Sequence, residues 1–152
     1  MIVVCDTSSL IRLRKGGVLK HVKKVFDEVW IPYAVFQECR DIATASEIIR
    51  LDFKTIRVKN VLAIGLGTGE RETISLAKER NIENILIDDE KGFKKAVEHD
   101  LKPIRSFDLL LIYKALKVIP SVKISLDRMI ANKENIDTIR YETVLEKAKE
   151  LQ

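Results

Sequence analysis

The hydrophobic positions of the chain fall into short continuous runs, separated by longer segments that have a helical period. Ile2–Cys5 and Asn84–Ile87 are the clearest runs, and such runs are typical of strands that are covered on both faces of a sheet. Further short strands are predicted at Val29–Ile31, Thr55–Val58 and Pro103–Ile104, the last at an edge of the sheet. The segments between these runs are long enough to form helices.

Helices are predicted between and after the strands. They cover Thr7 to about Lys24 with a break near Gly16-Gly17, Pro32 to about Arg40, roughly Thr44–Leu51, Glu70–Arg80, about Glu90 to His99, a Leu-rich segment capped by Ser106, and two more helices from Ser121 onward. Pro32 stands where proline is favoured, at the first position of a helix. Gly65–Gly69 is expected to be a loop.

Strands that alternate with helices indicate parallel βαβ units. The predicted fold is therefore α/β, a three-layer α/β/α arrangement with a central, mostly parallel sheet. The chain has 152 residues, the usual size of one domain, and its 46% of hydrophobic residues suffice for one core. We expect a single domain over residues 1–152, with extra C-terminal helices at about 121–152 packing on it.

Composition excludes several classes of protein. No apolar run reaches the roughly 18 residues that a bilayer-spanning helix needs, and Met1–Asp6 lacks the basic region of a signal peptide. We therefore expect a cytoplasmic protein with no membrane partner. The two cysteines are not spaced as in a zinc site, and Cys5 is expected to be buried in its apolar run.

Charge is slightly positive, with 27 Lys and Arg against 23 Asp and Glu, which alone indicates a polyanionic partner only weakly. The segment from Arg12 to Lys24 has six basic residues and no acidic one. It is either a binding surface for a polyanion or a solvated helix face, and both interpretations stay open. On the first interpretation, the candidate substrate contacts are Arg12, Lys20, Lys23 and Lys24.

Acidic residues follow two of the predicted strands. Asp6 ends the first strand, and Asp88 and Asp89 follow Asn84–Ile87. In parallel sheets, ligands bind beyond the carboxyl ends of the strands, so these side chains are candidate ligands. The alternative is that each aspartate only caps the helix that follows it. Glu38, in the helix opened by Pro32, is either a fourth member of this group or a surface residue.

Glu70 lies at the start of an apolar helical face. At about 100° per residue, Glu70, Ile74 and Ala77 form one stripe, and a buried carboxylate is costly unless it has a partner. Glu72 lies roughly 200° away, toward solvent. We therefore prefer Glu70 as a ligand and keep Glu72 in reserve.

Converging carboxylates repel one another unless a cation neutralises them. Oxygen ligands without His or Cys suit Mg²⁺ or Mn²⁺, and such ions catalyse phosphodiester hydrolysis. A competing interpretation treats Gly65, Gly67 and Gly69 as a phosphate cradle. Their spacing differs from the dinucleotide fingerprint, and Glu70 would repel a phosphate there.

Four segments, taken in order, resemble the motifs of the PIN-domain family. They are Ile2–Leu10 with Asp6 and its following hydroxyl residues, Ile31–Glu38, Gly69–Ala77 in the Gly-Glu-x-Glu variant of one prokaryotic branch, and Leu86–Asp89. The resemblance covers nearly the whole chain and implies a parallel sheet with flanking helices. It also implies Mg²⁺- or Mn²⁺-dependent cleavage of RNA. Many small prokaryotic members are toxins of VapC-like toxin–antitoxin pairs, and many form homodimers.

The resemblance also assigns roles to residues. It implies catalytic roles for Asp6, Glu38, Glu70 and Asp89, metal binding by these four and Asp88, and substrate contact by Ser8. The third acidic position is Glu where Asp is commoner, and the fourth motif lacks its usual Thr. Which of Asp88 and Asp89 contacts metal therefore stays open, as do the RNA substrate, the number of metal ions and the choice between toxin and processing nuclease.

Two other functions compete with a ribonuclease. A non-catalytic RNA- or partner-binding module could retain the same fold. An acidic-site phosphatase or another Mg²⁺ hydrolase would usually carry an Asp-x-Asp motif after the first strand, and here Asp6 is followed by Thr7 and Ser8.

Overall fold

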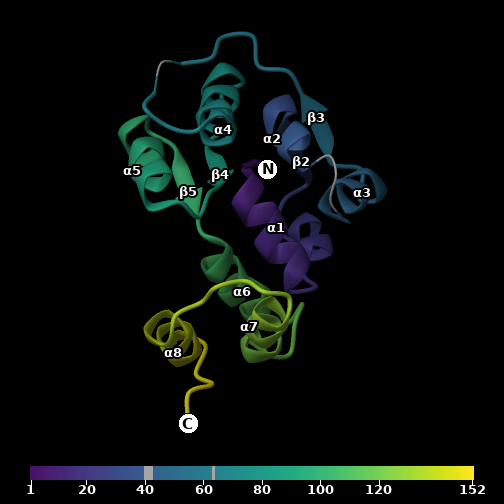
Figure 1. Cartoon of the computed structure of the whole chain (residues 1–152), viewed down its shortest axis with the longest axis vertical. Coiled ribbons are helices and arrows are strands. Elements are labelled where there is room, and N and C mark those ends of the chain that lie inside the picture. Colours follow the sequence, from purple (N-terminus) through teal and green to yellow (C-terminus); the bar gives the residue numbers. More distant parts are fainter. Residues whose placement is uncertain (40–42, 63) are drawn as a thin grey trace.

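A five-stranded parallel sheet forms the centre of the protein, in a computed structural model that describes residues 1–39, 43–62 and 64–152 (Figure 1). The strands are β1 (Ile2–Cys5), β2 (Glu28–Pro32), β3 (Lys54–Ile56), β4 (Asn84–Leu86) and β5 (Lys102–Ile104). They pair in the order β3-β2-β1-β4-β5, and every pair is parallel. The predicted α/β class is confirmed, as is the edge position of the last strand.

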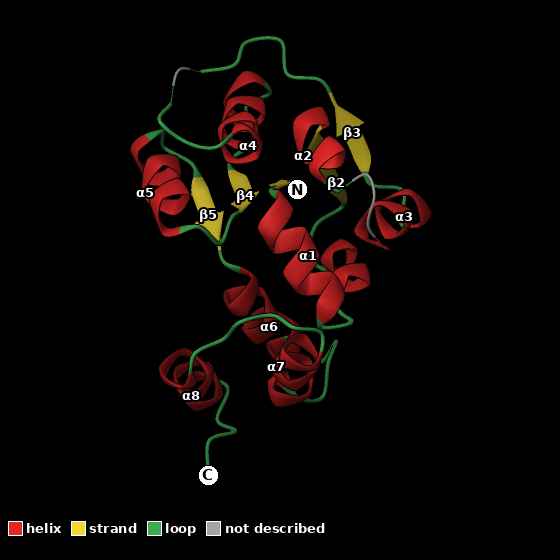
Figure 2. Cartoon of the chain, in the orientation of Figure 1, coloured by secondary structure: helices red, strands yellow, loops and turns green. Residues whose placement is uncertain are grey.

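Helices follow the strands as the hydrophobic period predicted (Figure 2). They are α1 (Thr7–Lys15), the 3-10 helix η1 (Leu19–Lys24), α2 (Tyr33–Glu38), α3 (Ala43–Arg50), α4 (Thr68–Glu79), α5 (Glu90–Glu98), α6 (Ser106–Ala115), α7 (Val122–Ala131) and α8 (Thr138–Lys147). The expected end of the second helix at Arg40 lies outside the described residues. Pro32 precedes α2 as its N-cap, and Ser106 is the first residue of α6, so both predicted positions were wrong by one residue.

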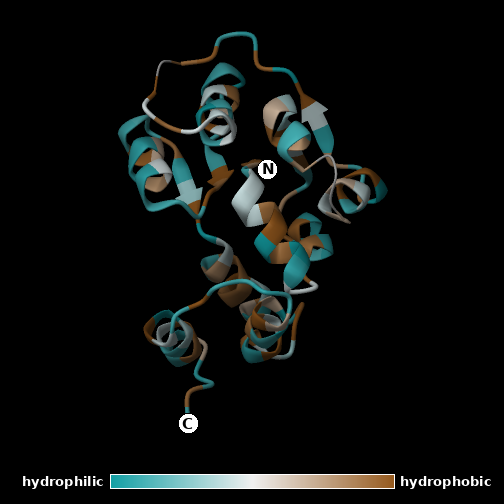
Figure 3. Ribbon diagram, viewed as in Figure 1, coloured by the Kyte–Doolittle hydropathy of each residue, from teal (hydrophilic) through white to brown (hydrophobic). Residues whose placement is uncertain are grey.

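Side chains that alternate along β1 enter two separate hydrophobic clusters. Val3 and Cys5 belong to a cluster with α1, η1, α6, α7 and α8, while Val4 belongs to another with α4 and α5. This alternation follows from the two-residue period of a strand, and it places helices on both faces of the sheet. Much of β4 and α6 is hydrophobic, as Figure 3 shows. Both cysteines are buried and free, as expected for Cys5.

The break between α1 and η1 depends on glycine. Gly17 has a φ of 73°, in the left-handed region that other residues rarely adopt. A Cβ at Gly16 would lie 2.8 Å from the Cε of Met129 in α7. The two glycines therefore turn the chain and let α7 approach α1, which confirms the predicted break.

The C-terminal helices α6, α7 and α8 lie on one side of the sheet and form the lower part of the molecule in Figure 1. Buried residues of these helices, including Tyr113, Leu126 and Val144, share the cluster that contains Val3. Glu150 accepts hydrogen bonds from the backbone nitrogen of Val122 at 2.8 Å and from other donors at the start of α7. No helix in the described part of the chain is long and apolar enough to cross a bilayer.

Candidate active site

Asp6 lies at the carboxyl end of β1 and is 1% exposed. Its Oδ1 accepts a hydrogen bond from the backbone nitrogen of Ser9 at 3.0 Å, so Asp6 is the N-cap of α1. Its Oδ2 has no hydrogen-bond partner among the described residues. A buried carboxylate oxygen without a donor is costly, which makes this atom a candidate for binding a cation.

Glu38 reaches the same region from the last turn of α2. The hydroxyl of Thr7 donates to its Oε2 at 2.6 Å. Its Oε1 lies so close to α4 that a Cβ at Gly69 would be only 2.6 Å away. Glycine at position 69 therefore lets the Glu38 carboxylate approach the N-terminus of α4, and Thr7 fixes its orientation.

Glu70 lies in the first turn of α4 and is half-buried. Ile74 and Ala77 are fully buried below it, which confirms the predicted apolar stripe. Glu70 borders a hollow with Asp6 and Glu38, whereas Glu72 is half-buried elsewhere and does not line it. The choice of Glu70 over Glu72 is therefore supported by position.

These three carboxylates line one hollow of about 90 Å³ at the carboxyl edge of the sheet. Its other lining residues are Thr7, Ser8, Gly67, Thr68 and Gly69. The N-termini of α1 and α4 both open onto it, and helix N-termini have positive dipole ends that stabilise negative charge. The structure thus brings together Asp6 and Ser8 with Glu38 and Glu70, from three separate segments of the chain.

Burial and mutual repulsion oppose the ionisation of the carboxyl groups that line the hollow. Burial raises the pKa of Asp6 to about 7; hydrogen bonding by Ser9 counters part of this rise, and the charges of Asp88 and Glu70 add to it. Burial also raises the pKa of Glu70, and the neighbouring carboxylates of Asp89 and Glu38 act in the same direction. Neutral carboxyl groups are therefore favoured until a cation compensates their charge.

Asp88 follows β4 but is already engaged by other residues. Its Oδ1 accepts the backbone nitrogen of Ser106 at 2.7 Å, and the Ser106 hydroxyl donates to its other oxygen. The guanidinium of Arg12 lies 3.2 Å from Oδ2, and the Asp88 side chain is 6% exposed. Asp88 thus holds the start of α6 against α1, and it does not line the carboxylate hollow.

Asp89 is exposed and caps α5, where its Oδ2 accepts the backbone nitrogen of Gly92 at 2.8 Å. It also lies outside the lining of the hollow, although its charge contributes to the raised pKa of Glu70. The contact that Asp89 forms is therefore that of a helix cap. A role of Asp89 or Asp88 in metal binding stays a prediction.

The basic segment from Arg12 to Lys24 does not lie together beside the carboxylates. Arg12 pairs with Asp88 and, at 3.1 Å, with Glu134, so its charge is already engaged. Lys20, Lys23 and Lys24 lie on or beside η1, which leads into the start of β2.

The side chain of Lys23 lies at the amino edge of the sheet. Its Nζ donates to the carbonyl of Leu51 at 3.2 Å, and it lines a hollow with Asp27, Glu28 and Lys54, where β2 and β3 begin. Lys23 thus lies away from Asp6, because α1 carries the chain away from the carboxyl edge before η1 begins. Contact of Arg12, Lys20, Lys23 and Lys24 with the substrate stays a prediction.

The donors of the hollow fit a hard divalent cation. All are oxygens, the type that Mg²⁺ and Mn²⁺ prefer, and the Oδ2 of Asp6 has no hydrogen-bond partner among the described residues. Within that same part of the chain, no three acidic, His or Cys side chains already stand at ligating distance of one point. Glu38 and Glu70 would therefore have to adjust when an ion binds beside Asp6.

Two residues of the hollow escaped the sequence reasoning, which singled out Ser8. Thr7 orients Glu38, and Gly69 permits its approach. The position of Thr7 directly after Asp6 and the Gly69-Glu70 pair were the available signals. Neither could identify Glu38 as the shared partner, because that contact joins residues 31 positions apart.

Comparison with known proteins gives one result. The family model DUF3368, which is described as a PIN domain, matches residues 2–150, nearly the whole chain. No curated protein and no solved structure shows a significant match.

Proposed function

Since the chain belongs to the PIN-domain family, whose members are generally nucleases that use divalent metal ions, we propose that it is a metal-dependent ribonuclease. It would hydrolyse phosphodiester bonds of RNA at the carboxyl edge of the sheet. The observation that carries this proposal is the buried, unpartnered Oδ2 of Asp6 in a hollow that Glu38 and Glu70 also line.

Asp6, Glu38 and Glu70 are the residues that would hold Mg²⁺ or Mn²⁺. A bound ion of this kind supplies an activated water and stabilises the charge of the transition state. The capping bond from Ser9 keeps the Asp6 carboxylate in place, and Thr7 does the same for Glu38. Asp6 thus presents its free oxygen in a fixed geometry, which lowers the cost of reorganisation there, whereas Glu38 and Glu70 would adjust toward the ion.

Ser8 is the candidate contact for the scissile phosphate. It is exposed at the rim of the hollow, in the first turn of α1. Its hydroxyl can donate to a phosphate oxygen, and the N-terminal end of α1 favours an anion there. A toxin role, an antitoxin partner and a homodimer are further predictions from the family resemblance.

Asp88 and Asp89 contribute in a different way in this proposal. Asp88 joins α6 to Arg12, and Asp89 starts α5, so both support the wall beside the hollow. The negative charge of Asp89 near Glu70 also strengthens the attraction for a cation.

The test is cleavage of a mixed pool of single-stranded RNA by purified protein with Mg²⁺, with Mn²⁺ and with a chelator. Cleavage should require the metal, spare duplex DNA and fall at least about a hundredfold in Asp6→Asn, as when one preorganised electrostatic group is lost. Asp100→Asn is the matched control, because Asp100 lies before β5 with a φ of 61° that Asn tolerates. This control should cleave like the wild type.

Two results would contradict the proposal. If the metal-loaded wild type left the RNA pool intact, a non-catalytic binding module would describe the protein better. Equal cleavage by Asp6→Asn and Asp100→Asn would show that the carboxylate hollow is not the catalytic centre.

A further inference from the structure

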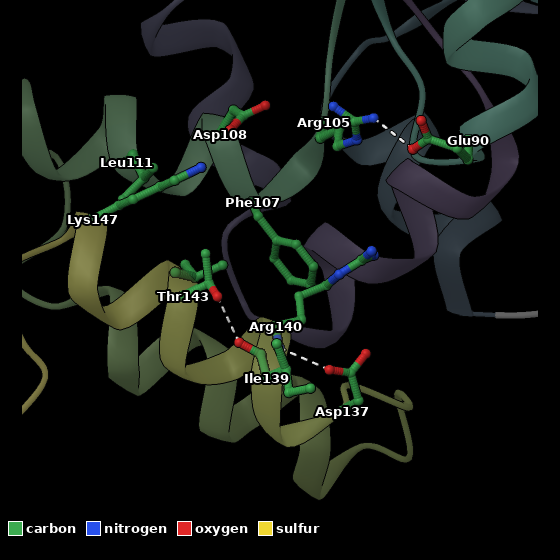
Figure 4. Close-up of a pocket in the computed structure, with 11 residues that line it drawn as sticks. Glu90, Arg105, Phe107, Asp108, Leu111, Asp137, Ile139, Arg140, Thr143 and Lys147 are labelled. Carbon is green, nitrogen blue, oxygen red and sulfur yellow. Dashed lines mark hydrogen bonds and ion pairs between the residues drawn. The ribbon is translucent and has the colours of Figure 1, made fainter.

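A second and larger hollow, of about 590 Å³, lies between α8 and the first part of α6, with Arg105, which joins β5 to α6, on its wall. Figure 4 shows the side chains that line it, among them Arg105, Phe107 from α6, and Arg140 and Lys147 from α8. Its volume is within the range of small-molecule binding sites. No sequence pattern indicated this hollow, because its walls come from parts of the chain that are far apart.

This hollow adjoins the carboxyl edge of the sheet. Glu90 on its rim directly follows Asp89. Arg105 and Phe107 flank Ser106, whose backbone nitrogen donates to Asp88 at 2.7 Å. The larger hollow therefore borders the two aspartates that follow β4.

Two exposed cations lie on one face of α8. Arg140 and Lys147 are seven residues apart, two helical turns, so they share a face. In Figure 4, Lys147 projects toward Asp108, and Arg140 projects beside Phe107. Neither side chain forms an ion pair with another described residue.

The acidic residues of the hollow are partly neutralised by neighbours. Glu90 pairs with Arg105 at 2.7 Å, and the Oδ1 of Asp137 caps α8 by accepting the backbone nitrogen of Arg140 at 2.8 Å. Asp108, in the first turn of α6, faces the same space. The hollow thus offers two unpaired cations together with carboxylate acceptors.

The remaining lining is apolar. It includes Phe107, Leu111, Val144 and Ile139, and Ile139 is 79% exposed, so its apolar surface is open to a ligand. A nucleotide combines the same properties, since its base has an apolar face with polar edges and its phosphate is an anion. Apolar side chains can contact the base, carboxylates can accept from its amino groups, and cations can bind the phosphate.

We propose that this hollow is a subsite for one nucleotide of the RNA strand, with Arg140 and Lys147 binding the backbone phosphates and Ile139 contacting the base. The inference rests on the proposed ribonuclease function and names where its substrate binds outside the carboxylate hollow. It differs from a substrate contact by Lys23, whose side chain lies where β2 and β3 begin, at the opposite edge of the sheet.

The test measures the affinity of a labelled single-stranded RNA at several salt concentrations, in the presence of a chelator that prevents cleavage. Arg140→Gln with Lys147→Gln should bind about tenfold more weakly, and the slope of log affinity against log salt should be shallower by about 1.4, because each phosphate contact contributes about 0.7. The pair Lys20→Gln and Lys23→Gln, also on exposed lysines, is the matched control and should leave the slope unchanged.

Ile139→Ser separates the base contact from the charge contacts. This variant should bind about fivefold more weakly at every salt concentration, with the slope of the wild type, because an apolar contact releases no counterions. The changed side chains are exposed, so all variants should fold, and circular dichroism checks this.

Two outcomes would contradict the proposed subsite, and a third would also contradict the proposed ribonuclease function. If the Arg140 and Lys147 variant binds RNA with unchanged affinity and slope, and the wild type shows metal-dependent cleavage, the protein is a ribonuclease whose RNA does not bind in this hollow. A shallower slope in the Lys20 and Lys23 control would place the RNA on η1 instead. A wild type that neither binds nor cleaves RNA would contradict both proposals.

Discussion

The acidic residues at the carboxyl edge of the sheet fall into two groups that differ in their partners. In the carboxylate hollow, the buried Asp6 has an oxygen with no hydrogen-bond donor in the part of the chain that the structure describes, and the pKa of Glu70 is raised by burial and by neighbouring acids. After β4, Asp88 is held by Ser106 and Arg12. The two groups lie near each other, since the charge of Asp88 contributes to the raised pKa of Asp6.

The difference indicates which acidic residue can bind a cation, Asp6, and which one stabilises the fold, Asp88. A carboxylate whose oxygens are satisfied by the protein gains little from a cation, whereas one left unsatisfied in a buried place gains much. The cost of keeping Asp6 unsatisfied is a loss of stability in the metal-free protein. Each substitution below changes one group and leaves the other in place.

Asp6→Asn should have the largest effect on stability. The folded-state pKa of Asp6 is about 7, against about 3.8 for an ordinary aspartate. Because the raised pKa favours the protonated form, Asp6 costs almost nothing below about pH 3 and progressively more as the pH rises through the unfolded-state value to about 7. At about 1.36 kcal/mol per pKa unit, the full cost is about 4 kcal/mol.

Asn removes this charge and can still accept the Ser9 hydrogen bond as an N-cap. In chelator, the variant should therefore be more stable than the wild type by about 4 kcal/mol at pH 8 and by only about 1 kcal/mol at pH 4.5, as measured by urea unfolding. With excess Mn²⁺ the difference should shrink or reverse, because only the wild type keeps the full site. A variant destabilised by about 1 kcal/mol at both pH values would make Asp6 a plain helix cap.

Asp88→Ala should act in the opposite direction. It leaves Ser106 without its acceptor and breaks a pair with Arg12 in which the side chains are 16% and 6% exposed. Removing one partner of a buried pair costs about 3 kcal/mol, and Glu134 retains part of the pairing of Arg12. Thermal or urea unfolding should show this loss with and without metal, and Mn²⁺ affinity should stay within about twofold of the wild type.

Asp89 should give the smallest change in stability. Asp89→Ala removes the cap of α5 and should cost about 1 kcal/mol, whereas Asp89→Asn retains an acceptor for Gly92 and should cost a few tenths. Comparing their unfolding midpoints checks the cap. Mn²⁺ affinity that falls tenfold in Asp89→Asn would instead show that Asp89 is a metal ligand.

Local patterns predicted most of the fold. The apolar run Asn84–Ile87 became β4 over Asn84–Leu86, and the stripe of Glu70, Ile74 and Ala77 became the buried face of α4. Strand and helix periods are properties of neighbouring residues, so a single sequence contains them. The same is true of Asp6, which is recognisable because it ends a buried strand.

Long-range contacts could not be predicted in this way. The partners of Asp88 are Ser106, 18 positions away, and Arg12 at the other end of the chain. The lysines of η1 seemed close to Asp6 along the chain, but the nine residues of α1 carry them away at roughly 1.5 Å per residue. The hollow beside α8 depends on how three segments pack and has no local pattern.

The most direct test of the account is the affinity of the protein for Mn²⁺, measured by calorimetry for the wild type, Asp6→Asn and Asp88→Asn. Both substitutions remove one carboxylate charge at the same edge of the sheet. If the unsatisfied oxygen of Asp6 binds the ion, Asp6→Asn should bind at least about tenfold more weakly, a change of about 1.4 kcal/mol, and Asp88→Asn should bind almost as the wild type does. Equal affinities for the wild type and Asp6→Asn, or a greater loss in Asp88→Asn, would contradict it.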